Sequence, residues 1–416
     1  MNIVTKLKRS MASANPYYWK LSIIEFFACS TGMVYNAYMT IYLQQVGMNV
    51  SQIGLLTALN MLAGILGSFF WGMQGDKLRS VKKAAIWALL CAAFLWSIVP
   101  LLGQILLSAA LVLIPVSAFF RVPPASGLVD NMTIQIASRC RLNFSTIRLW
   151  GTIGYVLVGF LLTALVPSLG VEISFYLYAA LALLAVLFMA IFIKNEDEPG
   201  KPDGQKRLSF RELHVGRLFS NYYFAAYCIY LMVLLMPISA GTSFLPYLME
   251  EMGVGTEQIG IFTAGKSFLE IPMLFVIMKI RRKFNLPTLL SVMGAIYLVQ
   301  QLLFSVTGSY WSLLAVSMLQ GPCVGIYLSC GADYVFRLAP EELKATAHMV
   351  GTSMSSLAGV IGNVFGGFLI DLVGIRQYYF ISGIIILAVL TMFLLSFPLG
   401  KNLLHRPLPE ALLRKG

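Results

Sequence analysis

Charged and polar residues interrupt an apolar part of the chain between positions 119 and 155, which reads as two helices joined by a short basic loop. Arg121, Asp130 and Arg148 lie within or beside apolar segments, where a charge usually has a charged partner, a water-filled cavity or a transported solute. Arg148, Thr152 and Tyr155 are spaced i, i+4 and i+7, so they share one helical face. An arginine, a hydroxyl and an aromatic ring on one face are suited to holding a polar solute with a flat or partly apolar surface.

The composition indicates a membrane protein. Of the 416 residues, 58% are hydrophobic and 12% are charged, and the mean hydropathy is +0.79, whereas soluble domains carry about 25% charged residues. The basic N-terminus has no short apolar core followed by a cleavage signal, so we expect no removable signal peptide. None of the six cysteines forms a CxxC pair, and we interpret them as packing residues. We therefore expect no disulfide framework, no metal site and no cofactor.

Hydropathy predicts an all-α membrane protein with twelve transmembrane helices in two six-helix pseudo-repeats, since a span takes about 20 apolar residues. We expect an N-terminal bundle at 1–193 and a C-terminal bundle at 221–416, joined by a charged cytoplasmic linker at 194–220. Within this linker, the SFREL segment at 209–213 predicts a short amphipathic helix on the membrane surface. The predicted spans are 17–45, 51–75, 84–102, 104–137, 145–167, 171–193, 222–250, 256–279, 286–307, 311–337, 343–373 and 376–398.

The positive charges predict the orientation of the chain. All but four of the 30 Lys and Arg residues fall on the side of the N-terminus; Arg376 lies on the other side, and Arg121, Arg148 and Lys266 lie within helices. Because cytoplasmic loops are enriched in Lys and Arg, we expect both termini in the cytoplasm of a cell whose inner membrane holds the protein. The net charge of +12 is then a topology signal, and we expect no nucleic-acid partner.

Two short motifs recur about half a chain apart. The Gln-Ile-Gly motif at 52–54 returns at 258–260, and in each predicted bundle it opens the second helix. Arg148-x-x-Gly-Thr is echoed by His348-x-x-Gly-Thr. Six spans in each copy would give parallel repeats, and parallel repeats that rock about a cavity at the midplane are one transporter architecture.

The loop after the second predicted helix, GMQGDKLRSVKK, resembles the G-x-x-x-D-[RK]-x-G-[RK]-x-[RK]-[RK] signature of the major facilitator superfamily. Arg79 stands where the second glycine is usual. The resemblance implies that the acidic residue and its basic neighbours form a gate that latches the two halves on the cytoplasmic side. The residues that fit the signature are Gly72, Asp76, Lys77, Lys82 and Lys83.

Within that superfamily, the chain resembles the proton-coupled lactose permease branch and its phenylpropionate and nucleoside permease relatives. The resemblance rests on an acid in helix four, Asp130, and on R-x-x-G-x-x-G-aromatic in helix five, which begins at Arg148, eighteen residues later, and ends at Tyr155. It implies that the acid and the arginine bind the solute and that the aromatic ring stacks on it.

The chain departs from the lactose permease pattern at several charged positions of that family. Lys266 aligns with a sugar-binding Glu of that family. Gln320 and Cys323 align with a His and a Glu of its helix ten, and Gln300 aligns with an Arg. The usual proton acceptor is therefore absent, and proton coupling would need another carboxylate.

Other intramembrane charges leave two interpretations each. Asp130 and Arg148 form either an ion pair that fixes packing or, as we favour, a solute-binding pair. Lys266 and Glu270, spaced i, i+4, form either a self-neutralised pair or a proton-coupling pair beside Pro272, which is expected to break the helix.

Two interpretations also remain for Glu25 and for Arg121. We interpret Glu25 as a residue that snorkels at the cytoplasmic edge, with a second coupling carboxylate as the alternative. Arg121 binds either an anionic group or a carboxylate, and the sequence does not choose between them. Asp333 and Arg337, also spaced i, i+4, are expected to form a local surface pair.

The sequence therefore predicts a secondary active transporter for proton-coupled uptake of a small polar solute such as a sugar or oligosaccharide, acting as a monomer. The alternative is a carrier of organic anions, aromatic acids or nucleosides, including an exporter. No HExxH, GxSxG or Walker motif indicates an enzyme or a nucleotide-driven pump. The candidate proton-coupling residues are Glu270, Asp130 and Glu25. The candidate solute-binding residues are Asp130, Arg148, Thr152, Tyr155, Lys266, Gln320 and Asn36.

Overall fold

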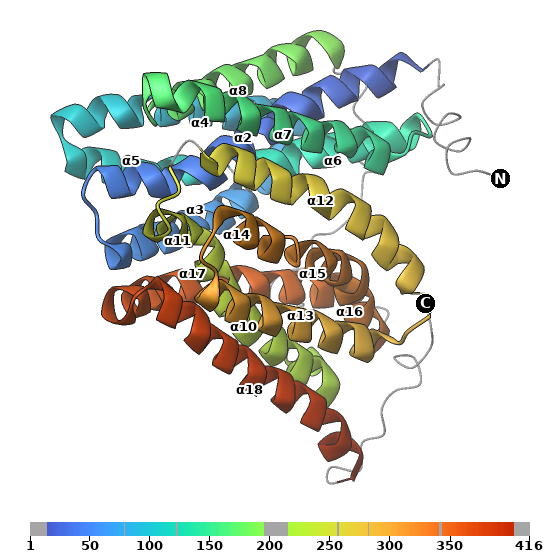
Figure 1. Ribbon diagram of the computed structural model, residues 1–416. Helices are drawn as coiled ribbons and strands as arrows, with labels where there is room; N and C mark the ends of the chain where they lie inside the picture. The colour runs from blue at the N-terminus through green and yellow to red at the C-terminus, as the bar shows by residue number, and fades with distance from the viewer. Residues whose placement is uncertain are drawn as a thin grey trace. The chain divides into compact units, whose positions relative to one another are not determined.

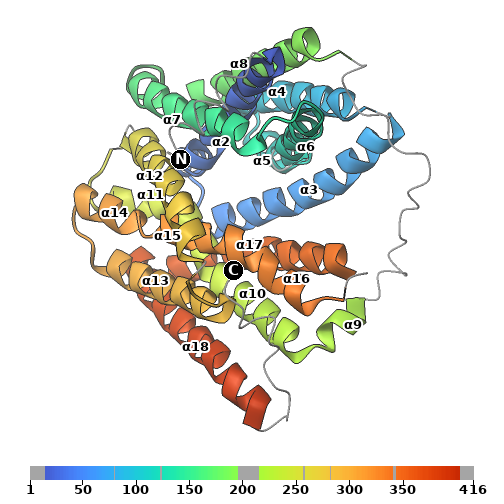
Figure 2. The ribbon, with the colours of Figure 1, turned by 90° about the vertical axis from the view of Figure 1, so that its right-hand side faces the viewer.

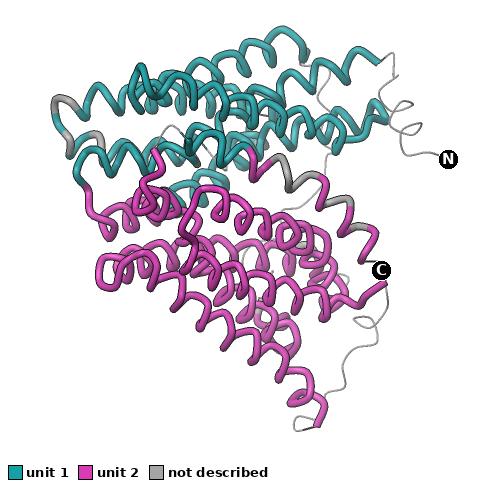
Figure 3. The backbone as a smooth tube through the Cα atoms, in the orientation of Figure 1, with its two compact units in different colours: residues 1–47, 59–204, 256–264 teal, residues 48–58, 205–255, 265–416 magenta. Residues whose placement is uncertain are grey.

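The computed structural model is built of helices, and its described residues contain no strand (Figures 1 and 2). Contacts divide the chain into two compact units, coloured separately in Figure 3. Unit 1 comprises residues 1–47, 59–204 and 256–264, and unit 2 comprises the rest. The structure describes residues 15–78, 80–121, 124–194, 215–255, 258–281, 283–340 and 343–402.

Unit 1 is a bundle in which α2 packs along α7 and α8, while α4 packs along α8, α5 and α6. Its core is apolar and includes the fully buried rings of Trp96, Phe175 and Tyr178. The helices are α2 (Pro16–Gln45), most of α3 (Val50–Lys77), α4 (Val81–Ile105), α5 (Leu107–Ala118), α6 (Pro124–Arg139), α7 (Phe144–Leu169) and α8 (Ile173–Phe192).

Unit 2 is a second bundle in which α10 packs along α17 and α18, and α13 packs along α18. Its helices are α9 (Val215–Phe219), α10 (Tyr222–Ser243), α11 (Leu245–Glu251), most of α12 (Gln258–Ile280), α13 (Leu286–Val306), α14 (Tyr310–Ser317), α15 (Gln320–Ile326), the π-helical turn η2 (Tyr327–Gly331), α16 (Ala332–Leu338), α17 (Lys344–Val373) and α18 (Ile375–Asn402).

Several of these helices begin at a short polar residue that the sequence places just before an apolar run. Asn15, Asn143, Asn221 and Asn285 each accept a hydrogen bond from a backbone N–H of the first turn of α2, α7, α10 and α13. Ser80 does the same for α4. Such caps satisfy N–H groups that have no partner within the helix, and they fix where each helix starts.

Within the described part of the chain, nine helical segments are long and apolar enough to cross a membrane. They are 50–75, 81–103, 144–169, 173–192, 222–243, 286–306, 310–338, 346–373 and 375–402.

Three predicted spans are interrupted. In the segment at 104–137, α5 ends at Ala118 and the chain forms a turn at 119–120 before α6, and the segment at 222–250 is divided at Phe244 between α10 and α11. The segment at 311–337 is divided into α14, α15, η2 and α16. Conversely, the expected break at Pro272 is wrong, because α12 continues through this residue. Proline is tolerated inside membrane helices where neighbouring groups compensate for the hydrogen bond that it removes.

The two Gln-Ile-Gly motifs each begin a helix whose first turns pack in the unit that does not hold its remainder. Residues 48–58 belong to unit 2, where a Cβ atom on Gly54 would lie 3.2 Å from Gly367 Cα of α17. Residues 256–264 belong to unit 1, where a Cβ atom on Gly260 would lie 2.5 Å from the Gly159 carbonyl oxygen of α7. Glycines thus allow close backbone contact at both crossings.

The crossing of α2 and α7 supplies a test of how tightly unit 1 is packed. A Cβ atom on Gly154 would lie 2.6 Å from the Phe26 carbonyl oxygen and 2.5 Å from Ser30 Oγ. We therefore expect Gly154→Ala to lower the free energy of unfolding by about 1–3 kcal/mol through overpacking. The thermal unfolding midpoint of the purified protein measures this.

The matched control is Gly127→Ala in α6, where an added Cβ atom would have no neighbour within 4 Å. There alanine should leave stability unchanged or raise it by up to about 1 kcal/mol, because alanine favours helix more than glycine does. Equal midpoints for the two variants would contradict the tight crossing of α2 and α7.

Candidate functional site

Arg148 lies between two carboxylates within unit 1. Its Nη1 atom is 3.1 Å from Glu25 Oε2 and 3.5 Å from Asp130 Oδ1. The three side chains come from α7, α2 and α6, which the bundle brings together. The ion pair between Asp130 and Arg148 that the sequence predicts is present, and Glu25 extends it to a cluster of three charges.

The interpretation of Glu25 as a residue that snorkels at the membrane edge is wrong. Its side chain is 0% exposed, and Arg148 reaches it with a charge-assisted hydrogen bond. Cys29, one turn further along α2, donates from its thiol to Glu25 Oε2 at 3.3 Å and also contacts the Arg148 guanidinium. A buried carboxylate needs such partners, because an unpaired ion costs several kcal/mol to desolvate.

Small residues on α7 allow this cluster to form. A Cβ atom on Gly151 would lie 2.6 Å from Cys29 Sγ and 3.2 Å from Arg148 Nη1. Only a glycine therefore leaves room for the thiol and the guanidinium side by side. The R-x-x-G spacing of the sequence thus has a direct steric reason in the fold.

The cluster is buried at one end and exposed at the other. Glu25 is fully buried, whereas the side chains of Arg148 and Asp130 are 40% and 30% exposed. Thr152 and Tyr155, which follow on the same helix, are half-buried, and the Tyr155 ring lies beside Gly32 of α2. The arginine, hydroxyl and aromatic side chains predicted to share a face are therefore all partly accessible.

The two carboxyl groups face the same guanidinium nitrogen, Arg148 Nη1. Among the described residues, Glu25 Oε1 and Asp130 Oδ1 have no hydrogen-bond donor. With both carboxylates ionised, the cluster of Glu25, Asp130 and Arg148 has an excess of one negative charge. A single proton on either carboxyl group would cancel that charge and would provide a hydrogen-bond donor in the cluster.

Arg121 lies apart from this cluster, at the break between α5 and α6. Its side chain is 0% exposed, and its Cζ atom is 3.8 Å from the centroid of the Tyr35 ring and 4.2 Å from that of Trp96. Its Nη2 atom donates to Asn60 Oδ1 at 3.4 Å. Of the two alternatives, the carboxylate partner is not found among the residues that the structure describes, where aromatic faces hold the guanidinium instead.

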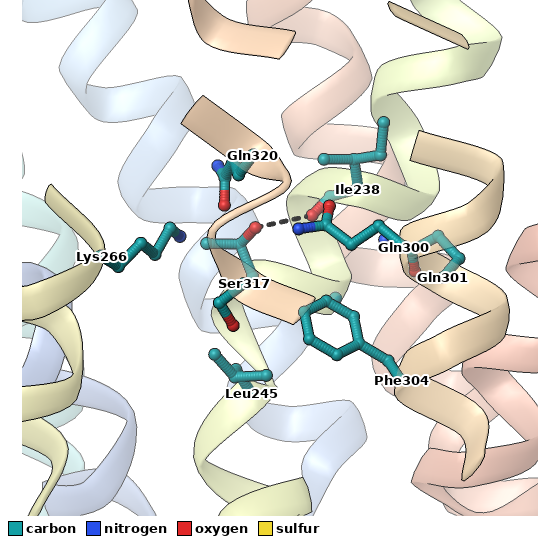
Figure 4. Close-up of a pocket in the computed structure, with 10 residues that line it drawn as sticks. Ile238, Leu245, Lys266, Gln300, Gln301, Phe304, Ser317 and Gln320 are labelled. Atoms are coloured by element: carbon teal, nitrogen blue, oxygen red, sulfur yellow. Dashed lines mark hydrogen bonds between the residues drawn. The ribbon is translucent and has the colours of Figure 1, made fainter. Parts of the chain in front are cut away.

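Lys266 and Gln320 line a small pocket in unit 2, together with polar residues that the sequence analysis did not select (Figure 4). Gln301 and Ser317 are 2% and 1% exposed, and Thr242 of α10 also lines the pocket. Neutral amides and hydroxyls in apolar segments carry little signal in a sequence, because only the fold shows that they converge. The lining residues are Ile238, Gly241, Thr242, Leu245, Lys266, Gln300, Gln301, Phe304, Ser317 and Gln320.

The cytoplasmic gate motif is only partly described. Gly72, Lys77 and Lys83 are exposed, whereas Lys82 is buried and donates to the Ile193 carbonyl oxygen at the end of α8. Lys82 thus caps a helix C-terminus within unit 1, where a positive charge is favourable.

Three candidate side chains and two segments lie outside the described residues. The side chains are those of Asn36, Asp76 and Glu270, so the pair of Glu270 with Lys266 is not described. The SFREL segment of the linker and Arg79 of the gate motif also lie outside the described residues.

The predicted pair of Asp333 and Arg337 is present at 2.9 Å, and Arg281 from the end of α12 joins it at 2.6 Å. Arg281 Nη1 also donates to the Ser329 carbonyl oxygen in η2 at 2.8 Å. The arginine therefore links the end of α12 to the backbone of the π-helical turn. The pair is therefore part of a small network rather than a local surface contact.

Comparisons with known proteins agree with this architecture. The family model "MFS_1 like family" matches residues 18–381. The maltose permease of Geobacillus stearothermophilus is 25% identical over 340 residues, which cover 81% of this chain and 81% of that protein. The sucrose permease of Escherichia coli is 24% identical over 418 residues, 96% of this chain and 98% of that protein. The transporter YwbF of Bacillus subtilis (strain 168) is 24% identical over 364 residues, 86% of this chain and 88% of that protein.

Among solved structures, the nucleoside transporter NupG superposes with a TM-score of 0.76 at 16% identity, covering 92% of this chain and 99% of that one. A bacterial homolog of the human lysosomal transporter Spinster gives a TM-score of 0.68 at 16% identity, covering 95% and 100%. At such identities the likeness is one of fold. Because the family model matches residues 18–381 and the two permeases align over 81% and 98% of their lengths, the chain belongs to the MFS_1-like family of the major facilitator superfamily and is a multi-pass membrane transporter.

Proposed function

We propose that this transporter couples protons to the uptake of a small neutral solute rich in hydroxyl groups, such as a sugar or short oligosaccharide. The observation that carries the proposal is the cluster in which Glu25 and Asp130 share Arg148. The guanidinium and the Asp130 carboxylate are partly exposed and offer donors and acceptors to solute hydroxyls. The relatives named maltose permease and sucrose permease support the choice of a sugar.

The proton would bind at the two carboxyl groups. One proton between Glu25 and Asp130 removes the excess negative charge of the cluster, and it leaves Arg148 with one ionised partner. A solute that binds Arg148 and Asp130 changes how these charges compensate one another. Proton and solute binding are thereby linked, as coupled transport requires.

Transport would proceed by alternating access between the halves at 1–193 and 221–416, with the linker at 194–220 and both termini in the cytoplasm. The asymmetry of Lys and Arg between the two sides supports this orientation in a cell membrane. We propose a monomer, because each chain carries both pseudo-repeats.

The test is uptake of radiolabelled maltose and sucrose into proteoliposomes with an imposed pH gradient, acidic outside. We expect accumulation of at least one of the two sugars, and we expect it to disappear when a protonophore collapses the gradient. Sugar accumulation that persists without proton movement would replace proton coupling with another driving ion. A failure of both sugars to enter or exchange would remove the sugar from the proposal.

A second candidate, a carrier of organic anions, aromatic acids or nucleosides, is favoured by Lys266, which brings a positive charge to the unit 2 pocket. A panel of disaccharides, nucleosides and aromatic acids scored for thermal stabilisation in detergent separates the two. Stabilisation by the acids and not by the disaccharides would select the second candidate, and its direction of transport would then include export.

A further inference from the structure

The two oxygen atoms of the Glu25 carboxyl group lie in different surroundings. Oε2 accepts a hydrogen bond from Arg148 Nη1 at 3.1 Å and another from Cys29 Sγ at 3.3 Å. Oε1 is buried, and it has no hydrogen-bond donor among the described residues. Buried polar atoms in native proteins are rarely left without a partner. The carboxylate is therefore satisfied at one oxygen atom and open at the other.

This difference favours Oε1 over Oε2 as the atom that takes up a proton. Oε2 already accepts two hydrogens, one of them from a cation, whereas the lone pairs of Oε1 are free. When Oε1 carries a proton, Oε2 remains a carbonyl oxygen and can still accept hydrogen bonds. Arg148 and Cys29 can therefore keep their places in both protonation states of Glu25.

The thiol of Cys29 determines which carboxyl oxygen faces the guanidinium. The terminal torsion of a glutamate side chain is broad, so a single donor does not fix the plane of the carboxyl group. Cys29 follows Glu25 by four residues on α2, and its thiol is the second donor to the same oxygen atom. The thiol also contacts the Arg148 guanidinium, which fixes it from the other side.

The neighbours of Glu25 come from the three helices that pack along α2, which are α6, α7 and α8. The charged and titratable groups of this cluster are Asp130 of α6, Arg148 of α7 and Cys29 of α2 itself. α8 has no acidic or basic residue between Ile173 and Phe192. In this cluster Cys29 is a neutral hydrogen-bond donor to the carboxylate.

We propose that Cys29 is a positioning residue for proton binding: its thiol and Arg148 together hold Glu25 Oε2 and leave Oε1 as the atom that takes the transported proton. The inference rests on the proposed function, because it assigns the proton of coupled transport to one atom. The proton comes from water on the acidic side and forms an O–H bond at Oε1. That bond breaks when the proton returns to water on the other side, and Cys29 keeps its own proton throughout.

Two substitutions of Cys29 should have different effects on proton binding. A donor to the ionised carboxylate favours the ionised form. Cys29→Ala removes this donor, so Glu25 should take up its proton at a pH about half a unit to one unit higher than in the wild type. Cys29→Ser restores a donor, and a hydroxyl donates more strongly than a thiol. Its midpoint should therefore lie at or below that of the wild type.

Infrared difference spectra of the purified full-length protein, recorded across pH, measure the midpoint without any solute. The C=O stretch of a protonated carboxyl group that disappears in Glu25→Gln belongs to Glu25. The S–H stretch that disappears in Cys29→Ser belongs to Cys29. This S–H band should move to higher wavenumber as Glu25 is protonated, because a neutral carboxyl oxygen accepts more weakly than a carboxylate. In Glu25→Gln it should not respond to pH.

The matched control is Cys91→Ala in α4, a half-buried free cysteine of the same unit. It should leave the midpoint of Glu25 unchanged. An unchanged midpoint in Cys29→Ala, or an equal rise in Cys29→Ala and Cys29→Ser, would overturn the role of the thiol. If Cys29→Ala does not fold, the S–H band of the wild type and the midpoint of Cys29→Ser decide the question.

Binding of maltose and sucrose to the same samples separates this inference from the proposed function. Because proton and solute binding are linked in symport, sugar affinity should fall as the pH rises through the midpoint of Glu25. Cys29→Ala should move that fall to higher pH by the same amount. Sugar binding together with a Glu25 midpoint that Cys29→Ala does not move would overturn the positioning role and leave the proposed function in place. No sugar binding at any pH would overturn the proposed function, while the infrared midpoints would still decide the role of the thiol.

Discussion

Arg148→Lys should lower the affinity of the transporter for its sugar by about 100-fold. Lysine keeps the positive charge but loses the planar fork with which arginine holds two oxygen groups at once. Glu25 and Asp130 share that fork in the structure. Hydrogen bonds to charged groups contribute about 1.5–3 kcal/mol each, so the loss of one such bond accounts for most of a 100-fold change.

Equilibrium binding and counterflow of labelled maltose and sucrose measure this effect. The control is Arg376→Lys, which conserves charge at the ion pair of Arg376 with Glu251, whose acceptor is 46% exposed. Exposed pairs contribute about 0–1 kcal/mol, so this variant should transport nearly as the wild type does. An unchanged affinity in Arg148→Lys, with normal thermal stability, would mean that the guanidinium does not bind the solute.

Glu25→Gln should abolish accumulation of sugar against its gradient while preserving sugar exchange. Glutamine has the shape of a protonated glutamic acid and cannot release a proton, so the cluster no longer carries the excess negative charge that a proton would cancel. Accumulation depends on protons crossing with the solute, whereas counterflow of labelled against unlabelled sugar needs no net proton movement. We therefore expect uptake driven by the pH gradient to fall to the level seen with a protonophore.

The companion measurement is counterflow by the same Glu25→Gln vesicles, which should stay within about threefold of the wild type, a difference of under 1 kcal/mol. Glu251→Gln, at the partly exposed pair with Arg376, provides the control and should leave both measurements unchanged. Loss of counterflow together with accumulation would assign Glu25 to folding or solute binding. Retained accumulation would place the proton on another carboxylate, such as Glu270.

The helical architecture follows from patterns that act locally. Long apolar segments with few charges predict membrane helices, because backbone groups in lipid must find their partners within the same segment. Asparagine and serine residues before several of these segments mark the helix starts, as at Asn143 and Ser80. The breaks were harder to predict: α12 continues through Pro272, whereas the chain leaves the helix at 318–319 without a proline there.

Part of the candidate site could likewise be predicted from the sequence, and part of it could not. The spacing of Arg148, Thr152 and Tyr155 defines a face of one helix, and the motif around Arg148 led to Asp130. The role of Glu25 was harder to predict. A lone carboxylate about two turns into a helix is consistent with the membrane edge and also with a buried partner 123 residues away. Gln301 and Ser317 are ordinary neutral residues, and only the fold shows that both are buried in the lining of one pocket.

The sequence by itself determined that this is a helical membrane protein, where its charges fall along the chain and which helical face carries arginine, hydroxyl and aromatic groups. Those properties depend on periodicity and hydropathy, which operate over one helix at a time. Only the tertiary structure decided that Glu25 and Asp130 share one guanidinium, that Arg121 lies between aromatic rings and that three amides and two hydroxyls line one pocket. Such groupings depend on which helices pack together, and residues remote in sequence then meet in a low-dielectric interior where each unpaired polar group is costly.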